Sequence, residues 1–217
     1  MAPLLEACCD SILTARNAQE FGAGRVELCG AGTGGTTPSI GLIALCREAL
    51  YVPLHVMIRP NTNGFVYSSD EFEVMKHDIA AAREIGVDGV VVGMLHDDDT
   101  IDMERMIEMI ELARPLNVTF HRAFDRTPDA SEAMDVLLSL GVDYVLTAGQ
   151  AVTALEGVAQ LRALQLQAGD RLTVLAGGGV RAHNVRDVVA RSGVREVHAN
   201  ATDSQIVRDL LLALAQA

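Results

Sequence analysis

Short aliphatic runs recur along the chain, separated by stretches whose apolar residues follow helical spacing. Met103, Met106, Ile107 and Ile110 form one such helical stripe. Compact aliphatic runs are typical of buried parallel strands. The runs that predict strands are Leu4–Cys9, Arg25–Cys29, Leu54–Arg59, Gly89–Leu95, Val118–Ala123, Tyr144–Gly149, Leu172–Gly177 and Glu196–Asn200.

Helix ends are marked by capping residues. Ser11 and Asp129 are placed to cap helices, and Pro38 to open one with Ser39 close by. The glycines that precede strands and fit helix C-caps are Gly22, Gly24, Gly86, Gly141 and Gly193. Eight strand-helix alternations without a long linker predict one α/β domain over residues 1–217, a TIM-type (β/α)8 barrel. An open doubly wound sheet is the competing interpretation.

Composition narrows the function classes. The 217 residues are 49% hydrophobic and carry a net charge of -12, which argues against a nucleic-acid or anionic-membrane binder. No run is long and apolar enough for a transmembrane helix, and the N-terminus shows no secretory signal, so we expect a cytoplasmic protein. The four cysteines form no CxxC pair and are expected to be thiols.

Two consecutive predicted strands carry the same signature, a glutamate followed two residues later by a cysteine. These are Glu6 with Cys8 and Glu27 with Cys29. Residues two apart on a strand share a face, so neighbouring strands would bring two carboxylates and two thiols together. Because burying unpaired charge is costly, this grouping indicates a site. By the same alternation Cys9 should face the helices.

Other polar residues gather near the carboxyl ends of the predicted strands. The groups expected to share faces are His55, Met57 and Arg59; Thr119 and His121; Val145, Thr147 and Gly149; and His198 on the last strand. A barrel interior that needed only filling would carry Val, Ile and Leu there. The pattern therefore predicts a polar pocket at the open end of the barrel.

The motifs ELC–GTGGTTPS, MIRP–NGFVYSSDEF, VTFHRAFD, VLTAGQ, AGGGV and EVHA occur in that order. In these motifs the chain resembles the CutC family, linked to copper homeostasis, from about Leu5 to His198. The resemblance implies a TIM barrel, a cytosolic location and self-association, commonly as a dimer. It also implies a Cu(I) role, with Cys8 and Cys29 at the positions of the family's suspected copper ligands.

The chain departs from the family pattern in three places. NTNG follows MIRP where a basic or glycine-rich stretch is usual, and Ala148 stands where the family's LTSG has a serine. His198 is followed almost directly by ATDSQIV, where family members carry a long loop with a Met-Arg-Tyr segment.

Each candidate residue has a structural alternative. Cys8 and Cys29 are Cu(I) ligands, or they line the pocket as small apolar side chains. Glu6 and Glu27 form an acid/base pair, or they are buried acids satisfied by Arg59 or another interior arginine.

The HRAFD motif has two interpretations. His121 points into the pocket as acid, base or ligand with Arg122 turned outward, or it is hydrogen-bonded in the wall while an Arg122–Asp125 pair fixes the loop. His198 follows the same logic on the last strand. The run Asp97–Asp99 is expected to be a solvated turn.

An anion site is the remaining candidate. In phosphate-binding barrels, glycine amides near strands seven and eight cradle the anion, here Gly178 and Gly179 with Asn184 at the following helix. Phe65 and Tyr67 could form part of a lid. The only lysine, Lys76, lies in a predicted helix, which excludes a Schiff-base aldolase.

Two hypotheses follow. The first is a copper-handling protein that binds Cu(I) through Cys8 and Cys29, with Met57 or a histidine as auxiliary ligand. The second is an enzyme acting on a small anionic or polar metabolite. In it Glu6, Glu27 and His121 would move protons, and the residues that would hold the substrate are Arg59, Tyr67, Thr147, Gly178, Gly179, Asn184 and His198.

Overall fold

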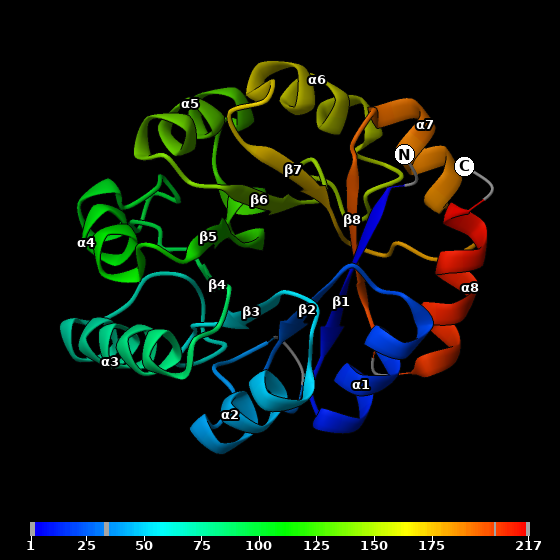
Figure 1. Ribbon diagram of the computed structural model, residues 1–217. Coiled ribbons are helices and arrows are strands. Elements are labelled where there is room, and N and C mark those ends of the chain that lie inside the picture. Colours follow the sequence, from blue (N-terminus) through cyan, green and yellow to red (C-terminus); the bar gives the residue numbers. More distant parts are fainter. Residues whose placement is uncertain (1–2, 33–34, 202, 216–217) are drawn as a thin grey trace.

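The computed structural model describes residues 3–32, 35–201 and 203–215. Within them, parallel strands close into a barrel in the order β1 to β8, and the helices surround it (Figure 1). The strands are β1 (Leu4–Cys9), β2 (Arg25–Leu28), β3 (Leu54–Met57), β4 (Gly89–Val92), β5 (Asn117–Phe120), β6 (Tyr144–Thr147), β7 (Thr173–Ala176) and β8 (Glu196–Asn200). The predicted (β/α)8 barrel is confirmed, and the open sheet was wrong.

Helices follow the strands in regular alternation. They are α1 (Ile12–Phe21), α2 (Ile40–Ala49), α3 (Ser69–Ile85), α4 (Met103–Ala113), the short 3-10 helix η1 (Arg122–Arg126), α5 (Ala130–Leu140), α6 (Val158–Ala168), α7 (Val185–Ser192) and α8 (Ser204–Leu214). Only residues 201–203 separate β8 from α8, and Thr202 lies outside the described residues. None of the described helices is long and apolar enough to cross a membrane.

Most predicted helix ends are confirmed. Ser11 and Asp129 cap α1 and α5 through their side chains. The glycines that close helices in the left-handed conformation are Gly22, Gly86, Gly141 and Gly193. Two expectations were wrong. Ser39, and not Pro38, is the N-cap of α2, and Gly24 closes no helix but leaves room for Leu4, whose Cγ would lie 2.6 Å from an added Cβ.

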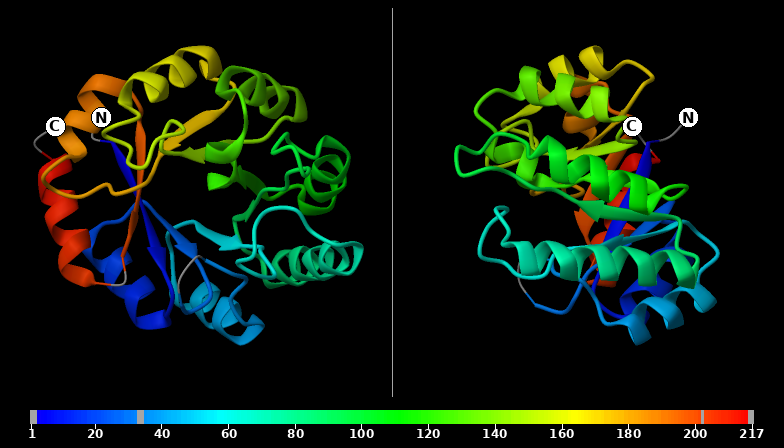
Figure 2. Two further views of the ribbon diagram at one scale, coloured as in Figure 1. Left: turned by 180° about the vertical axis from the view of Figure 1, so that it is seen from behind. Right: turned by 90° about the vertical axis from the view of Figure 1, so that its left-hand side faces the viewer.

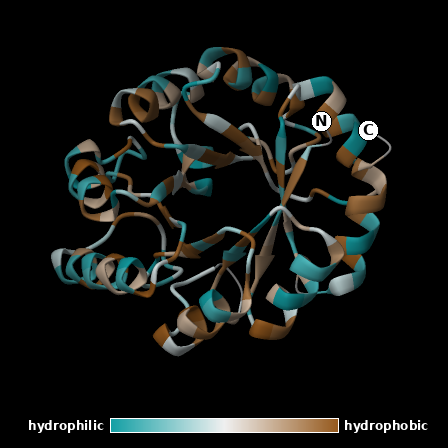
Figure 3. Cartoon of the chain, in the orientation of Figure 1, coloured by the Kyte–Doolittle hydropathy of each residue, from teal (hydrophilic) through white to brown (hydrophobic). Residues whose placement is uncertain are grey.

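Strands β2 to β5 end one to three residues earlier than predicted, because the chain leaves the hydrogen-bonded ladder before the aliphatic pattern stops. The outward faces of the strands pack against the apolar stripes of the helices. Leu5, Ala7 and Cys9 belong to this layer, so Cys9 faces the helices as predicted. Figure 2 shows the helices enclosing the barrel, and Figure 3 shows hydrophobic and hydrophilic segments alternating along them.

The amino-terminal half of the barrel interior is closed by four polar side chains, here named the floor cluster: Glu6, Arg25, Tyr144 and Glu196. The Arg25 Nε donates to Glu6 Oε2 at 2.5 Å, and an Nη donates to Glu196 Oε2 at 2.6 Å. The guanidinium lies 4.5 Å above the Tyr144 ring, across the barrel. Arg25 and Glu6 are almost fully buried, so each charge depends on the other.

Burial raises the pKa of Glu6, but the Arg25 guanidinium and His198 outweigh it and hold the pKa well below the ordinary value of 4.5. A depressed folded-state pKa adds stability above the ordinary pKa, and this stability is lost as the pH falls. The floor cluster therefore stabilises the barrel at neutral pH and weakens it in acid.

We expect Glu6→Gln to lower the free energy of unfolding by about 3 kcal/mol at pH 7, because it leaves Arg25 with less compensating charge. The difference in unfolding free energy between variant and wild type should narrow as the pH falls from 4.5 toward 3, because Glu6 of the unfolded wild type takes up a proton there while Glu6 of the folded protein stays ionised. Urea unfolding across this pH range checks it, with exposed Glu156→Gln as control. A difference in unfolding free energy between Glu6→Gln and the wild type that does not change with pH would contradict the role of the Glu6 charge.

Gly89 of β4 gives a test of interior packing. A Cβ at this position would lie 2.6 Å from the His55 ring. Gly89→Ala should therefore destabilise the protein by about 1–3 kcal/mol. Gly41→Ala is the matched control, because Gly41 lies in α2 with no atom near its Cβ position, and this change should stabilise by about 0.5–1 kcal/mol. Thermal unfolding that shows equal effects at both sites would contradict the packing.

Candidate functional site

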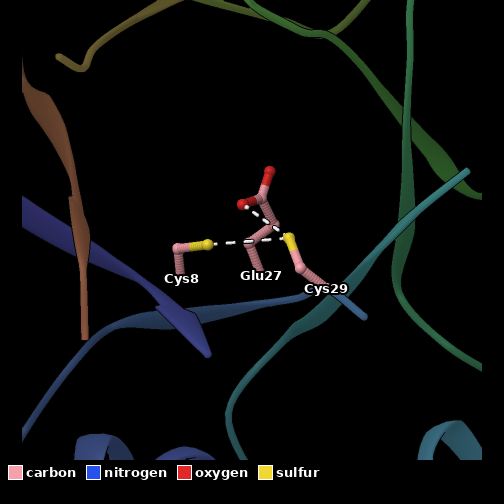
Figure 4. Close-up of side chains that lie close together, drawn as sticks. All are labelled: Cys8, Glu27 and Cys29. Carbon is pink, nitrogen blue, oxygen red and sulfur yellow. Dashed lines mark hydrogen bonds between the residues drawn. The ribbon is translucent and has the colours of Figure 1, made fainter. Parts of the chain in front are cut away.

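Two thiols meet at the carboxyl end of the barrel (Figure 4). Cys8 lies near the end of β1 and Cys29 directly after β2, and their Sγ atoms are 3.6 Å apart. The parallel register that pairs Cys8 with Glu27 brings them together. Cys29 Sγ also donates to Glu27 Oε2 at 3.4 Å. The predicted convergence of acid and sulfur is confirmed for these three residues.

Met57 completes a cluster of soft donors. Cys29, Met57 and Val91 pack together, and Cys8 lies against them. We call Cys8, Cys29 and Met57 the sulfur cluster. The chain passes close by at Gly35, where an added Cβ would be 3.5 Å from Cys29 Sγ and 3.6 Å from the Met57 methyl carbon. The cluster is therefore enclosed on the side of this loop.

His198 of β8 connects the floor cluster to the thiols. Its Nδ1 lies 2.8 Å from Glu6 Oε1 and its Nε2 lies 3.7 Å from Glu27 Oε2. Burial lowers the pKa of His198, but Glu27, Cys8 and Glu6 outweigh it and raise the pKa well above 6.5. A protonated ring donates a hydrogen bond to Glu6 through Nδ1, and its charge lies close to Glu27 on the other side.

The two glutamates occupy different environments. Glu6 belongs to the floor cluster, where Arg25 holds its pKa well below 4.5, and its catalytic role stays a prediction. The arginine that satisfies it is Arg25 and not Arg59. Glu27 lines the pocket, and burial and the nearby Cys8 raise its pKa well above 4.5. Its Oε1 is buried without a partner among the described residues.

The two thiols are electrostatically unequal. The hydrogen bond with Cys29 and the neighbouring His198 lower the pKa of Cys8 well below 9.0. The hydrogen bond to Cys8 and burial raise the pKa of Cys29. Cys8 is thus the more readily ionised thiol of the pair.

His121 stands directly after β5, in the pocket wall. Its Nδ1 accepts a hydrogen bond from the Ala123 amide at 3.2 Å, and its Nε2 is buried without a partner in the described structure. Burial and nearby Arg59 lower its pKa to about 3. At neutral pH the ring is therefore uncharged and a weak proton acceptor, and its part in catalysis stays a prediction.

Two arginines line the same pocket. The Arg59 guanidinium lies 4.7 Å above the Phe65 ring, and Phe65 lies 5.0 Å from the His121 ring. Arg122 was expected to turn outward, but it lines the pocket while its Nε donates to Asp125 at 2.7 Å. The loop-fixing Arg122–Asp125 pair is thus confirmed, and it aims the arginine at the pocket mouth.

Thr147 does not line the pocket. Its neighbour Leu146 does, so strand alternation turns Thr147 away, and its hydroxyl donates to Asp125 Oδ1 at 2.5 Å. Thr147 thus lies outside the pocket where it was predicted, and its substrate role stays an untested prediction. The residue helps Asp125 to hold the loop after β5.

The remaining anion-site candidates also lie outside this pocket. Asn184 donates to the Gly179 carbonyl and accepts from the Arg181 amide, which fixes the glycine turn. Gly178 and Gly179 adopt positive φ angles of 105° and 67°, so they form this turn. Tyr67 is buried and lines a separate groove that includes Phe72 and Arg105, and its part at the pocket stays a prediction.

The cleft formed by the sulfur cluster, His198 and the arginines has a volume of about 180 Å³ and is lined also by Phe65 and Leu146. Arg25 lies two residues before Glu27, and Glu196 two residues before His198, so strand alternation turns Arg25 and Glu196 into the barrel as well. The sequence analysis did not predict these two interior side chains. Lys76 lies on α3 and pairs with Glu73 and Glu108, far from barrel chemistry.

The donor set suits Cu(I). Thiolates and thioethers are its preferred ligands. With metal–sulfur bonds of about 2.3 Å, trigonal binding needs sulfurs about 4 Å apart, and Cys8 and Cys29 Sγ need to separate only slightly from 3.6 Å. One oxygen of Glu27 completes a group whose ligand atoms lie within 4.8 Å of one another.

Comparison with known proteins agrees with this architecture. A copper homeostasis protein cutC homolog of Mus musculus is 45% identical over 203 residues, covering 93% of this chain and 75% of that relative. A CutC family protein of Chromobacterium violaceum is 46% identical over 202 residues, covering 93% and 82%.

A solved structure of a CutC protein also resembles this chain. A CutC protein from Streptococcus agalactiae superposes with a TM-score of 0.88 at 32% identity, covering 93% of this chain and 100% of that chain. Thiamine phosphate pyrophosphorylase from Pyrococcus furiosus, at a TM-score of 0.67 and 16% identity over 99% of this chain and 96% of that one, shares the fold alone. The family model that matches residues 3–203 is that of the CutC family, and the chain belongs to this family.

Proposed function

We propose that the protein binds one Cu(I) ion at the sulfur cluster and handles copper in the cell. The observation that carries the proposal is the 3.6 Å approach of Cys8 and Cys29 Sγ in a pocket that also holds Met57. The relatives named for copper homeostasis support it. A cytoplasmic location and assembly into a dimer remain predictions.

The site favours Cu(I) over harder ions. Cys8 and Cys29 supply thiolates and Met57 a thioether, whereas burial raises the pKa of the neighbouring Glu27 carboxyl well above 4.5 and so favours its neutral form. A neutral carboxylic acid is a poor ligand for Zn²⁺ or Mg²⁺. The protonated His198 is likewise occupied by its acceptors Glu6 and Glu27.

Each group near the metal has a defined part. Cys8 is more exposed than the buried Cys29, and Cys29 loses its proton on binding. The Cys29 proton leaves to solvent, and Glu27 Oε2, 3.4 Å from Cys29 Sγ, helps to hold that sulfur in place. His198 is held by its hydrogen bond with Glu6 and places its charge 3.7 Å from Glu27. Copper, when bound, supplies only a soft Lewis-acid centre.

Cys8→Ala and Cys29→Ala test the proposal. Each should weaken Cu(I) binding at least about hundredfold, because loss of outer-shell partners alone costs 10–100-fold. The measurement is anaerobic competition with a chromophoric Cu(I) chelator, where the wild type should bind about one equivalent per chain. Cys9→Ala is the matched control, since Cys9 lies on the same strand but faces the helices. Unchanged binding in the Cys8/Cys29 double variant would remove the proposal.

Met57→Leu isolates the thioether. Leucine conserves the volume, so the fold should be kept while the soft donor is lost. We expect about tenfold weaker Cu(I) binding and a change from three sulfur neighbours to two in the copper X-ray absorption spectrum. Three sulfur neighbours in the variant would contradict a ligand role for Met57.

A further inference from the structure

The sulfur cluster uses only part of the pocket. The rest is lined by Arg59, His121 and Arg122, which we call the arginine cluster. None of these residues is needed to bind Cu(I), and a cation gains nothing from two guanidinium groups nearby. In a chain with a net charge of -12, two arginines at one mouth create a local field that attracts anions.

His121 presents a hydrogen-bond donor to this part of the pocket. Because the Ala123 amide donates to Nδ1 at 3.2 Å, that nitrogen carries no proton, and the neutral ring carries its proton on Nε2. The Nε2 is buried and lacks a partner among the described residues. Buried polar atoms normally have a partner, so an unpaired donor facing a cavity indicates an acceptor that the cavity takes up.

The orientation of His121 is fixed by packing. A Cβ on Gly93 would lie 2.5 Å from the ring, so only glycine admits the ring there. Phe65 covers it at 5.0 Å and is itself covered by the Arg59 guanidinium at 4.7 Å. The His121 Nε2–H group is therefore held in place before a ligand binds, so that little conformational entropy is lost on binding.

Arg122 is positioned just as firmly. Asp125 holds its Nε at 2.7 Å, and this carboxylate is fixed in turn by the amides of Ala148 and Gln150. The far end of the guanidinium lies beside Gly178, where an added Cβ would be 3.2 Å from Nη1. The planar terminal nitrogens of an arginine match the two oxygens of a carboxylate.

Cavity size and lining limit the ligand. At about 180 Å³ the pocket is smaller than the 300–1,000 Å³ typical of drug-sized ligands. Leu146 and Phe65 add apolar surface beside the charged groups. A phosphate site built from glycine amides is not supported, since Gly178 and Gly179 lie outside the lining. The combination suits a short organic anion with a planar charged end.

We propose that the arginine cluster binds the carboxylate of a small organic acid of three or four carbons. Arg59 and Arg122 contact the charged oxygens, and His121 Nε2–H donates to a carboxylate or adjacent carbonyl oxygen. The ligand body lies against Phe65 and Leu146. The arginine cluster shares one cleft with the sulfur cluster but uses different side chains, and the proposal does not rest on copper binding.

Calorimetric titration of copper-free, reduced protein tests this site, with pyruvate as the probe and pyruvamide as its neutral counterpart. Wild-type protein should bind pyruvate and show no measurable binding of pyruvamide. Equal binding of both, or binding of neither, overturns the proposal without any variant. Binding of inorganic phosphate in place of pyruvate overturns the assignment to a carboxylate.

Variants locate the binding. Arg122→Gln and His121→Gln should each weaken pyruvate binding at least about tenfold, as expected for a lost hydrogen bond to a charged group. Arg126→Gln is the matched control, because Arg126 lies on the same short helix η1 but is exposed and pairs with Asp99. Wild-type affinity in folded Arg122→Gln would overturn the proposal.

The Cys8/Cys29 double alanine variant separates the two proposals. It should lose Cu(I) and still bind pyruvate. Loss of pyruvate binding in this variant, with its thermal unfolding unchanged, would overturn the independent anion site. If the wild type binds pyruvate normally but does not bind Cu(I), only the copper proposal is contradicted.

Discussion

The buried ion pair between Arg25 and Glu6 is the interaction on which the rest of the site depends. It lies below the pocket, where neither charge reaches water. Without Arg25 the Glu6 carboxylate would have to take up a proton, because an uncompensated buried charge is too costly. With Arg25 in place, Glu6 stays ionised and is the acceptor that fixes His198 at 2.8 Å.

The consequences spread upward through the barrel. His198 links the floor cluster to Glu27 and Cys8: it helps to lower the pKa of the Cys8 thiol, whereas burial and Cys8 raise the pKa of Glu27. Strand register then places Cys29 beside Cys8 and adds Met57 from the next strand. The result is a soft, weakly charged binding surface, beside which Arg59 and Arg122 form a region of opposite character.

The sequence was enough to predict the features that follow from the regular spacing of hydrophobic and polar residues. Alternation along β1 and β2 placed Glu27, Cys8 and Cys29 on one face, and the spacing of aliphatic runs predicted a closed barrel. The prediction failed at β6, where the inward face was assigned to Val145, Thr147 and Gly149, one residue away from the side chains that point inward. Thr147 was then assigned to the interior, although Leu146 and Tyr144 occupy it.

What sequence could not provide were contacts between distant strands and the conformations of loops. The partner of Glu6 is Arg25 of the adjacent strand, and only the register shows that the two align. Arg122 lines the pocket while its Nε donates to Asp125. The motif predicted this pair, but not that the arginine would face the pocket. Tyr67 was assigned to the pocket by its loop, but its own turn carries it to another groove.

Diffraction at the copper absorption edge, from crystals loaded with Cu(I) under anaerobic conditions, tests the central claim most directly. We expect a single anomalous peak within about 2.3 Å of both Cys8 and Cys29 Sγ, with Met57 turned toward it. A peak at surface groups such as His96 and Asp97, with the thiols unchanged, would contradict it.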